Sequence, residues 1–270
     1  LKKINSKFQK KLSFINILGI NKLESLIKIF KNKKFLVDGS TCSIFYKNII
    51  EKNNTIKKDI DPIYYLKAQK NEVEINNTKK IHEYDGAALT KFLFWIQNNF
   101  KKEKITELMA QKKLLSFRKK FEKFKFPSFP TISSTGPNGA IVHYNATKKT
   151  NRVLKSGSIY LVDSGGQYHY GTTDVTRTIC FSKQSQNIKN IFTNVLKGHI
   201  AVASTNLKTH NNGKKIDKRA RKYLNQNNLD YSHGTGHGVG FFLNVHEGPQ
   251  SISKTNKVEI KEGMILSNEP

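Results

Sequence analysis

The stretch that decides the fold is SIYLVDSGGQYHYGTTDVTRTICF, residues 158–181. Its two ends, Ser158–Asp163 and Thr173–Phe181, have the composition of strands, and the GGQYHYG between them carries enough glycine to reverse the chain. An antiparallel hairpin of this kind brings Asp163 and Asp174 onto one face of a sheet. Ionised carboxylates in a sheet core are costly unless they meet a cation or several donors. Either aspartate read alone is better explained as a turn cap, and the alternative of a cation site gains weight only with further ligands downstream.

Two histidines and a glutamate downstream extend this pattern. His233 and His237 lie four residues apart in HGTGHGVG, and Glu269 lies in GMILSNEP. Four is the spacing of the helical HExxH zinc motif, but the four glycines of the run would each cost a helix about 1 kcal/mol. We therefore expect tightly packed strand or loop backbone beside a ligand. Carboxylates and imidazoles together are the ligands of divalent metals, although one isolated histidine would more often be an ordinary core residue.

The composition is that of a globular protein with a strong basic bias. The chain has 270 residues, 37% of them hydrophobic, and a net charge of +27. Its lysines are spread along the whole sequence and no arginine cluster is interleaved with aromatic residues, so we expect no nucleic-acid partner. No apolar run approaches the roughly 18 residues of a membrane span, so we expect no membrane partner. Cys42 and Cys180 form neither a CxxC site nor a disulfide framework, which favours the cytoplasm.

The expected elements are those of an α+β protein. Within the first 60 residues we expect a helix at Leu23–Phe30 and strands at Phe35–Asp38 and Cys42–Tyr46, followed by a boundary turn at Asp61-Pro62. Apolar residues at three- and four-residue steps predict further helices, which span Thr78–Phe100, start at Thr106, cover 188–200 and span Ile216–Asn225. In the second of these we expect Leu108, Leu115 and Phe117 to face the core.

Five segments of the chain closely resemble the catalytic domain of aminopeptidase P, the Xaa-Pro aminopeptidase of the pita-bread metallopeptidases. They are HEYDGAALTKFLFWI (82–96), TGPNGAIVHY (135–144), DSGGQYHYGTTDVTRT (163–178), HGTGHGVGFFLNVHEGP (233–249) and GMILSNEP (263–270). The resemblance implies an α+β pita-bread catalytic domain over residues 61–270, incomplete at its C-terminus. Residues 1–60 would then be the C-terminal part of a preceding creatinase-N-type α/β domain.

The same resemblance implies the site residues. Asp163 and Asp174 would be metal ligands, with Asp174 bridging two ions, and His237 and Glu269 would bind the second ion. A further bridging glutamate is expected on a strand after Glu269, beyond the end of this sequence. His143, His233 and His246 match the histidines that line the substrate pocket and move protons, and Glu269 matches the residue that takes the proton of the attacking water.

The implied cofactors are two divalent metal ions, with manganese favoured over zinc because the ligands are rich in oxygen. A hydroxide shared by two such ions has a depressed pKa and can attack a peptide carbonyl at neutral pH. The implied substrates are peptides with proline at the second position, and the implied assembly of the full-length protein is a homodimer. We further expect that the sequence is a fragment lacking both ends, and that it is inactive alone.

Two other functions stay open from the sequence. One is a prolidase that cleaves only Xaa-Pro dipeptides. The other is a non-catalytic pita-bread binding module, comparable to the histone-binding domain of a chromatin chaperone. Such modules typically lose the ligands, whereas this chain keeps every ligand that its length permits, so we rank the module below the enzyme.

Overall fold

The structure is a computed structural model and describes residues 6–270, which fall into two compact units divided between Tyr64 and Tyr65. Helix α4 (Pro62–Ala68) spans this division and begins at the expected boundary turn. The identity of residues 1–60 as part of a creatinase-N-type domain stays a prediction. No helix among the described residues has both the length and the apolar character needed to cross a bilayer.

The first unit is built around a parallel pair of strands. Strands β1 (Lys34–Val37) and β2 (Thr55–Lys58) are joined by helix α3 (Ile44–Glu51), the crossover that parallel strands require. Its other helices are α1 (Ser6–Lys11), a short 3₁₀ turn at Ile20–Lys22 and α2 (Leu23–Ile29). A small core cluster joins α2, β1 and α3 through Ile27, Val37, Ile49 and Ile50.

The strand expected at Cys42–Tyr46 is wrong, because most of this segment lies in α3. The hydroxyl of Ser43 accepts a hydrogen bond from the amide of Phe45 and caps the helix, which then places Ile49 and Ile50 in the core. A short apolar run does not by itself distinguish a strand from a helix.

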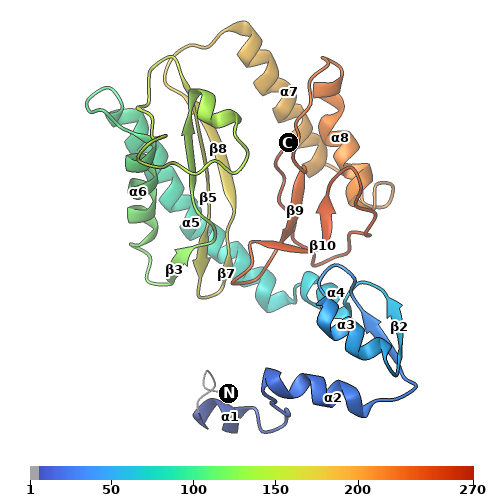
Figure 1. Ribbon diagram of the computed structural model, residues 1–270. Helices are drawn as coiled ribbons and strands as arrows, with labels where there is room; N and C mark the ends of the chain where they lie inside the picture. The colour runs from blue at the N-terminus through green and yellow to red at the C-terminus, as the bar shows by residue number, and fades with distance from the viewer. Residues whose placement is uncertain (1–5) are drawn as a thin grey trace. The chain divides into compact units, whose positions relative to one another are not determined.

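The second unit contains three small antiparallel sheets and four longer helices (Figure 1). Strands β4 (Ile132–Thr135), β5 (Ile159–Ser164) and β8 (Val175–Cys180) form the first sheet. The second contains β3 (Phe124–Pro127), β6 (Gly166–Tyr168) and β7 (Gly171–Thr172). The third pairs β9 (Gly236–Val239) with β10 (His246–Ile252). A 3₁₀ turn, η2, covers Gly136–Ala140.

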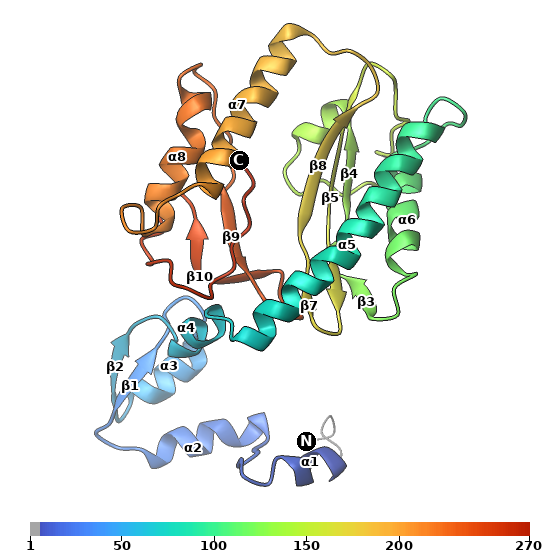
Figure 2. The same cartoon turned by 180° about the vertical axis from the view of Figure 1, so that it is seen from behind.

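Helices α5 (Glu72–Asn99) and α6 (Glu107–Arg118) lie along the β4–β5–β8 sheet, and the two figures show them on the same side of it (Figure 2). Apolar side chains from both helices, from β5 and from the connecting segments make the main core: Leu89, Phe92, Ile96, Ile105, Ala110, Leu114, Leu154, Tyr160 and Val162. Helix α5 starts six residues before the expected Thr78, because Asn71 and Glu74 form a reciprocal capping box. Thr106 caps α6 as expected.

The core-facing side of α6 differs from the expected one. Its buried residues are Ala110 and Leu114 together with the charged Glu107 and Arg118, whereas Leu108 and Leu115 are only partly buried. Burial of the two charges is possible because distant segments supply their partners; Arg118 forms a two-pronged ion pair with Asp85 of α5, at 2.7 and 2.9 Å.

Helices α7 (Gln186–Ala203) and α8 (Gly213–Asn225) pair with each other beside the β9–β10 sheet (Figure 1). The expected apolar stripe of α7 forms, but its Phe192, Leu196 and Ile200 are exposed. The buried residue of α7 is Gly198, where an added Cβ would lie 2.4 Å from the carbonyl oxygen of Ala220 in α8. The absence of a side chain at Gly198 therefore permits the two helices to pack closely.

Candidate metal centre

Two carboxylates reach the site from the first sheet. Asp163 of β5 lies opposite Thr176 of β8 in the antiparallel register, and Asp174 precedes β8 by one residue. Side chains two positions apart on a strand share a face, so Asp163, Asp174 and Thr176 point to the same side of the sheet. The expected antiparallel pairing and the shared face are therefore confirmed.

Asp163 is in an environment that is unfavourable for a carboxylate. Its Oδ1 is buried and has no hydrogen-bond partner among the described residues. Burial, followed by the nearby charge of Asp174, raises the pKa of Asp163 from 3.8 to about 7. A cation at this position would remove the cause of both anomalies.

The other two candidate ligands come from the third sheet and the segment beside it. His237 lies on β9, and the amide of Glu269 donates to the carbonyl of Thr235 at 2.8 Å. A second backbone hydrogen bond joins the same two segments: the amide of Ser267 donates to the carbonyl of His237 at 2.9 Å. The segment that carries Glu269 therefore runs beside β9 as an added strand-like stretch.

The glycines around His237 permit these close approaches. A Cβ at Gly236 would lie 2.1 Å from the carbonyl oxygen of Ser267, and one at Gly238 would lie 2.2 Å from that of Glu247. Any larger residue would push these backbones apart. The prediction of tightly packed strand backbone in this run is confirmed.

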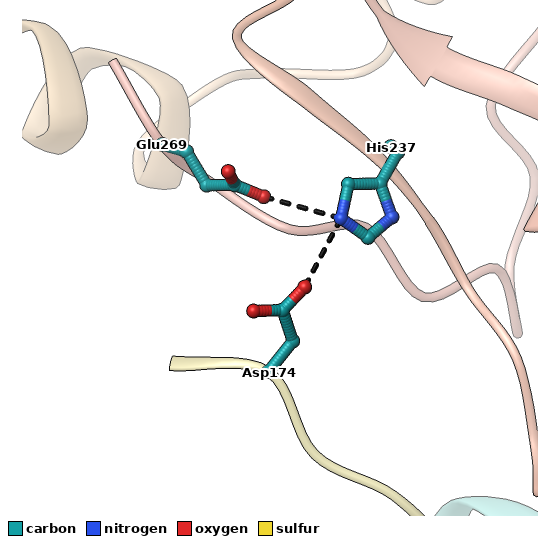
Figure 3. A group of neighbouring side chains, drawn as sticks. All are labelled: Asp174, His237 and Glu269. Carbon is teal, nitrogen blue, oxygen red and sulfur yellow. Dashed lines mark hydrogen bonds and ion pairs between the residues drawn. The ribbon is translucent and has the colours of Figure 1, made fainter. Parts of the chain in front are cut away.

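Asp174, His237 and Glu269 converge from these elements, as Figure 3 shows. His237 Nε2 lies 3.1 Å from Asp174 Oδ2 and 3.3 Å from Glu269 Oε1. One ligand atom from each of the three residues lies within 4.8 Å of the others. His237 Nδ1 lies 2.8 Å from the carbonyl oxygen of Gly238, which fixes the ring and directs Nε2 to the two carboxylates.

The electrostatics of this trio are those of a site that attracts a cation. Burial alone would lower the pKa of His237, but hydrogen bonds to Asp174 and Glu269 outweigh it and raise the pKa to about 10. Burial likewise raises the pKa of Glu269, yet its hydrogen bonds to His237 and Ser267 leave that pKa below the usual value. Glu269 Oε1 is buried, and it lies 3.3 Å from His237 Nε2. Three carboxylates and an imidazole with unsatisfied oxygens fit divalent metal ions.

A cavity of about 320 Å³ opens over these side chains. Its walls are Phe129, Pro130, Ile132, His143, Tyr144, Asn145, Asp163, Asp174, His237, His246 and Glu269. The ring centroid of His246 lies 4.0 Å from that of His237 and 6.5 Å from that of His143. Burial and the charge of His237 lower the pKa of His246. Six of the seven site residues expected from the sequence therefore line one cavity.

The seventh, His233, does not line this cavity. Its exposed ring stacks on Tyr231 with centroids 4.8 Å apart, and its Nδ1 lies 2.8 Å from the carbonyl oxygen of Gly234. Its charge still acts on Glu269 as one of the influences that lower the pKa of that residue. A direct role of His233 in the substrate pocket stays a prediction.

Sequence reasoning missed the residues that support these ligands. The hydroxyl of Ser267 accepts from the amide of His237 at 2.9 Å. Buried Arg221 pairs with Asp217 and donates to the carbonyl of His233, and Asp217 in turn accepts from the hydroxyl of Thr235. Ser267 lies two residues from Glu269 and could have been found as a neighbour, but nothing in the sequence pairs Arg221 with a loop 12 residues away. The apolar wall at 129–132 lies in an irregular segment without periodicity.

Comparison with known proteins agrees with this geometry. A model of metallopeptidase family M24 matches residues 76–270. A probable Xaa-Pro aminopeptidase P of Laccaria bicolor is 42% identical over an alignment of 256 residues that covers 93% of this chain and 39% of the relative. Xaa-Pro aminopeptidase 1 of Dictyostelium discoideum is 40% identical over 280 residues, covering 99% of this chain and 44% of the relative. The chain thus spans about two-fifths of the length of the curated relatives that it matches.

Solved structures share the fold. The crystal structure of X-prolyl aminopeptidase from Caenorhabditis elegans, described as a cytosolic enzyme with a di-nuclear active site, matches with a TM-score of 0.89 and 31% identity. The match covers 99% of this chain and 45% of that one. A prolidase from Pyrococcus furiosus matches with a TM-score of 0.74 over 97% of this chain and 76% of that one. Its 23% identity shows the fold alone, and the expected pita-bread fold is confirmed.

Proposed function

We propose that this chain, which belongs to metallopeptidase family M24, forms the metal-binding part of an aminopeptidase that removes the residue preceding proline from the N-terminus of peptides. The observation that carries the proposal is the convergence of Asp174, His237 and Glu269 beside the buried, unpartnered oxygen of Asp163. The similarity to proteins named Xaa-Pro aminopeptidase supports the substrate class.

We assign the metal ligands from the convergence of Asp174, His237 and Glu269, from the position of Asp163 in the same cavity, and from the resemblance. Asp163 and Asp174 would hold one divalent ion, and Asp174, His237 and Glu269 would hold a second, with Asp174 shared between them. When bound, the two ions would supply Lewis acidity that activates water and polarises the peptide carbonyl. Manganese suits this oxygen-rich set better than zinc does.

The remaining groups would handle protons and position the peptide. Glu269, whose buried Oε1 lies 3.3 Å from His237 Nε2, would accept the proton of the attacking water. His246 and His143, which lie at the wall of the same cavity, would donate hydrogen bonds to the developing oxyanion and to the leaving proline nitrogen. We propose that His233, exposed near Glu269, exchanges protons with solvent. The apolar wall of Phe129, Pro130 and Ile132 would contact the substrate side chains.

The experiment compares three substrates with the full-length protein loaded with manganese. An Xaa-Pro-Xaa tripeptide should be cleaved to a free amino acid and a Pro-Xaa dipeptide, and an Xaa-Ala-Xaa tripeptide should resist. Cleavage of the Xaa-Pro dipeptide without cleavage of the tripeptide would establish the prolidase alternative instead. Retention of manganese without hydrolysis of any of the three would establish the non-catalytic module.

We further propose that the 270-residue chain alone is inactive or nearly so, since the resemblance calls for a bridging glutamate beyond Glu269 and the chain spans about two-fifths of its relatives. Hydrolysis of the tripeptide by this chain at the rate of the full-length protein would refute that point. The homodimer rests on the resemblance alone. A cytoplasmic location agrees with two free cysteines and with a structural relative described as cytosolic.

A further inference from the structure

Glu107, the first residue of α6, is a fully buried carboxylate that the proposed mechanism does not use. No basic side chain among the described residues lies within ion-pair distance of it. Its Oε1 accepts from the amide of Thr135 at 2.8 Å and from Asn138 Nδ2 at 3.0 Å. Its Oε2 accepts from the hydroxyl of Tyr144 at 2.9 Å and from the amide of Arg152 at 3.0 Å. Four donors replace the missing cation, because an isolated charge would be too costly to bury.

All four donors belong to one segment, residues 135–152, and this segment carries His143. Asn138 and Tyr144 fall on either side of His143, at five residues before it and one residue after it. Between Ile141 and Asn151 the backbone forms no helix or strand, so no ladder of backbone hydrogen bonds fixes its course. The Glu107 carboxylate supplies the side-chain contacts on both sides of His143, through Asn138 and Tyr144. At the far end of the segment the backbone amides of Glu107 and Leu108 also donate to the Arg152 carbonyl and to Asn151 Oδ1.

His143 itself depends on that backbone for its placement. Its φ of 56° lies in the left-handed region, which non-glycine residues adopt only when the surroundings hold them there. No described residue makes a hydrogen bond to its ring, although the ring lies at the cavity wall, 6.5 Å from that of His246. The direction of the imidazole thus follows from the backbone that Glu107 secures.

We infer that Glu107 is a positioning residue that acts through His143. It does not line the cavity and does not touch the reacting atoms; it holds the 135–152 segment so that the His143 ring faces the candidate metal ligands. The inference rests on the proposed function for its catalytic consequence, but the structural consequence, a changed His143 environment, can be measured without any activity.

The first experiment uses Glu107→Gln in the full-length protein. Glutamine puts an amide donor against one of the four existing donors, so the segment must shift. Misplacement of a supporting group typically costs about 10- to 100-fold in activity, and we expect a loss of that size in kcat/KM with manganese content unchanged. If Glu107 acts through His143, the same substitution in a His143→Ala background should have less than about a twofold effect, because the two share one pathway. Full additivity of the two losses would overturn the inference.

The matched control is Asp85→Asn, which breaks a comparably buried ionic network at the opposite end of α6 without touching the 135–152 segment. Its effect on activity should be small and should add to that of His143→Ala. An equal, non-additive loss from Asp85→Asn would show that general destabilisation explains both variants.

The second experiment does not need activity. In the full-length protein, labelled at histidine, the ring resonances of His143 should shift on Glu107→Gln, while those of His210, which lies in another part of the unit, should not. Unchanged His143 resonances would overturn the inference even if the proposed peptidase activity proves correct; shifted resonances with no peptidase activity would leave the positioning intact and reject the function. If Glu107→Gln does not fold, Asn138→Ala removes one donor from the same carboxylate and should give the same shift at smaller amplitude.

Discussion

Replacement of Asp163 by asparagine should stabilise the metal-free protein and strongly reduce its stabilisation by metal. The folded-state pKa of Asp163 is about 7 against 3.8 for the ordinary side chain. At 1.36 kcal/mol per unit, ionised Asp163 costs the native state at most roughly 4 kcal/mol. Between about pH 4 and pH 7 the native state binds more protons at Asp163 than the unfolded state does. The contribution of Asp163 to the free energy of unfolding therefore falls as the pH rises and reaches its lowest value near pH 8. The asparagine side chain carries no charge, so the substitution removes this loss.

The assay is urea unfolding at about pH 8 with a chelator, followed by the fluorescence of Trp95, the single tryptophan, which packs against the main core of the second unit. Asp163→Asn should shift the transition to higher urea by an amount that shrinks towards pH 4. With manganese at 100 times its Kd the unsubstituted chain should gain about 2.7 kcal/mol, and the variant should gain much less.

A matched control is Asp230→Asn. Hydrogen bonds to Lys254 and Arg221 hold the pKa of Asp230 far below its usual value, so this substitution should destabilise the metal-free protein and leave the gain from manganese intact. A less stable Asp163→Asn in chelator, or a full manganese response in that variant, would refute the assignment of Asp163 as a carboxylate held in place for a cation.

Three further predictions address other parts of the unit. Asp174→Asn in the full-length protein should abolish turnover and reduce retained manganese, because Asp174 is the ligand shared by both proposed ions; near-normal activity and metal content would remove it from the site. In the metal-free protein at about pH 8 the imidazole of His237 is protonated, since its pKa is about 10. Manganese binding should therefore release about one proton, which calorimetry in buffers of different ionisation enthalpy would measure. Release near zero would place His237 outside the site. Asp85→Asn should lower the free energy of unfolding by roughly 3–5 kcal/mol, because it leaves the buried guanidinium of Arg118 without its anion; a loss below about 1 kcal/mol in urea unfolding would show that water or another group compensates.

The sequence predicted the elements whose signals are local. Strand composition and glycine content predicted the strand pair that carries Asp163 and Asp174, and the glycine run around His237 excluded a helix because each glycine weakens one. The chemistry of the donor set, two aspartates, a histidine and a glutamate, then predicted a cation site without any knowledge of their distances.

The sequence failed where distant segments decide the outcome. The burial of Glu107 is stabilised by donors at 135–152, and that of Arg118 by Asp85, 33 positions away. No periodicity within α6 reveals such partners, so Leu108 and Leu115 were assigned to the core in their place, whereas Phe117 does pack against the core as expected. The strand wrongly expected at Cys42–Tyr46 had a local signal that was overlooked, the capping serine at 43.

The candidate ligands originate in two different sheets, Asp163 and Asp174 in one and His237 and Glu269 beside the other. One half of the unit contains the β4–β5–β8 sheet and the other contains the β9–β10 sheet, and the chain connects them through α7, α8 and their loops. Ions shared by these side chains would crosslink the two halves. Removal of the ions should therefore let the halves separate transiently, and amide exchange should accelerate first along β9 and the 265–269 segment, well before the packed core under α5 opens. Metal content would then govern proteolytic lifetime as well as chemistry.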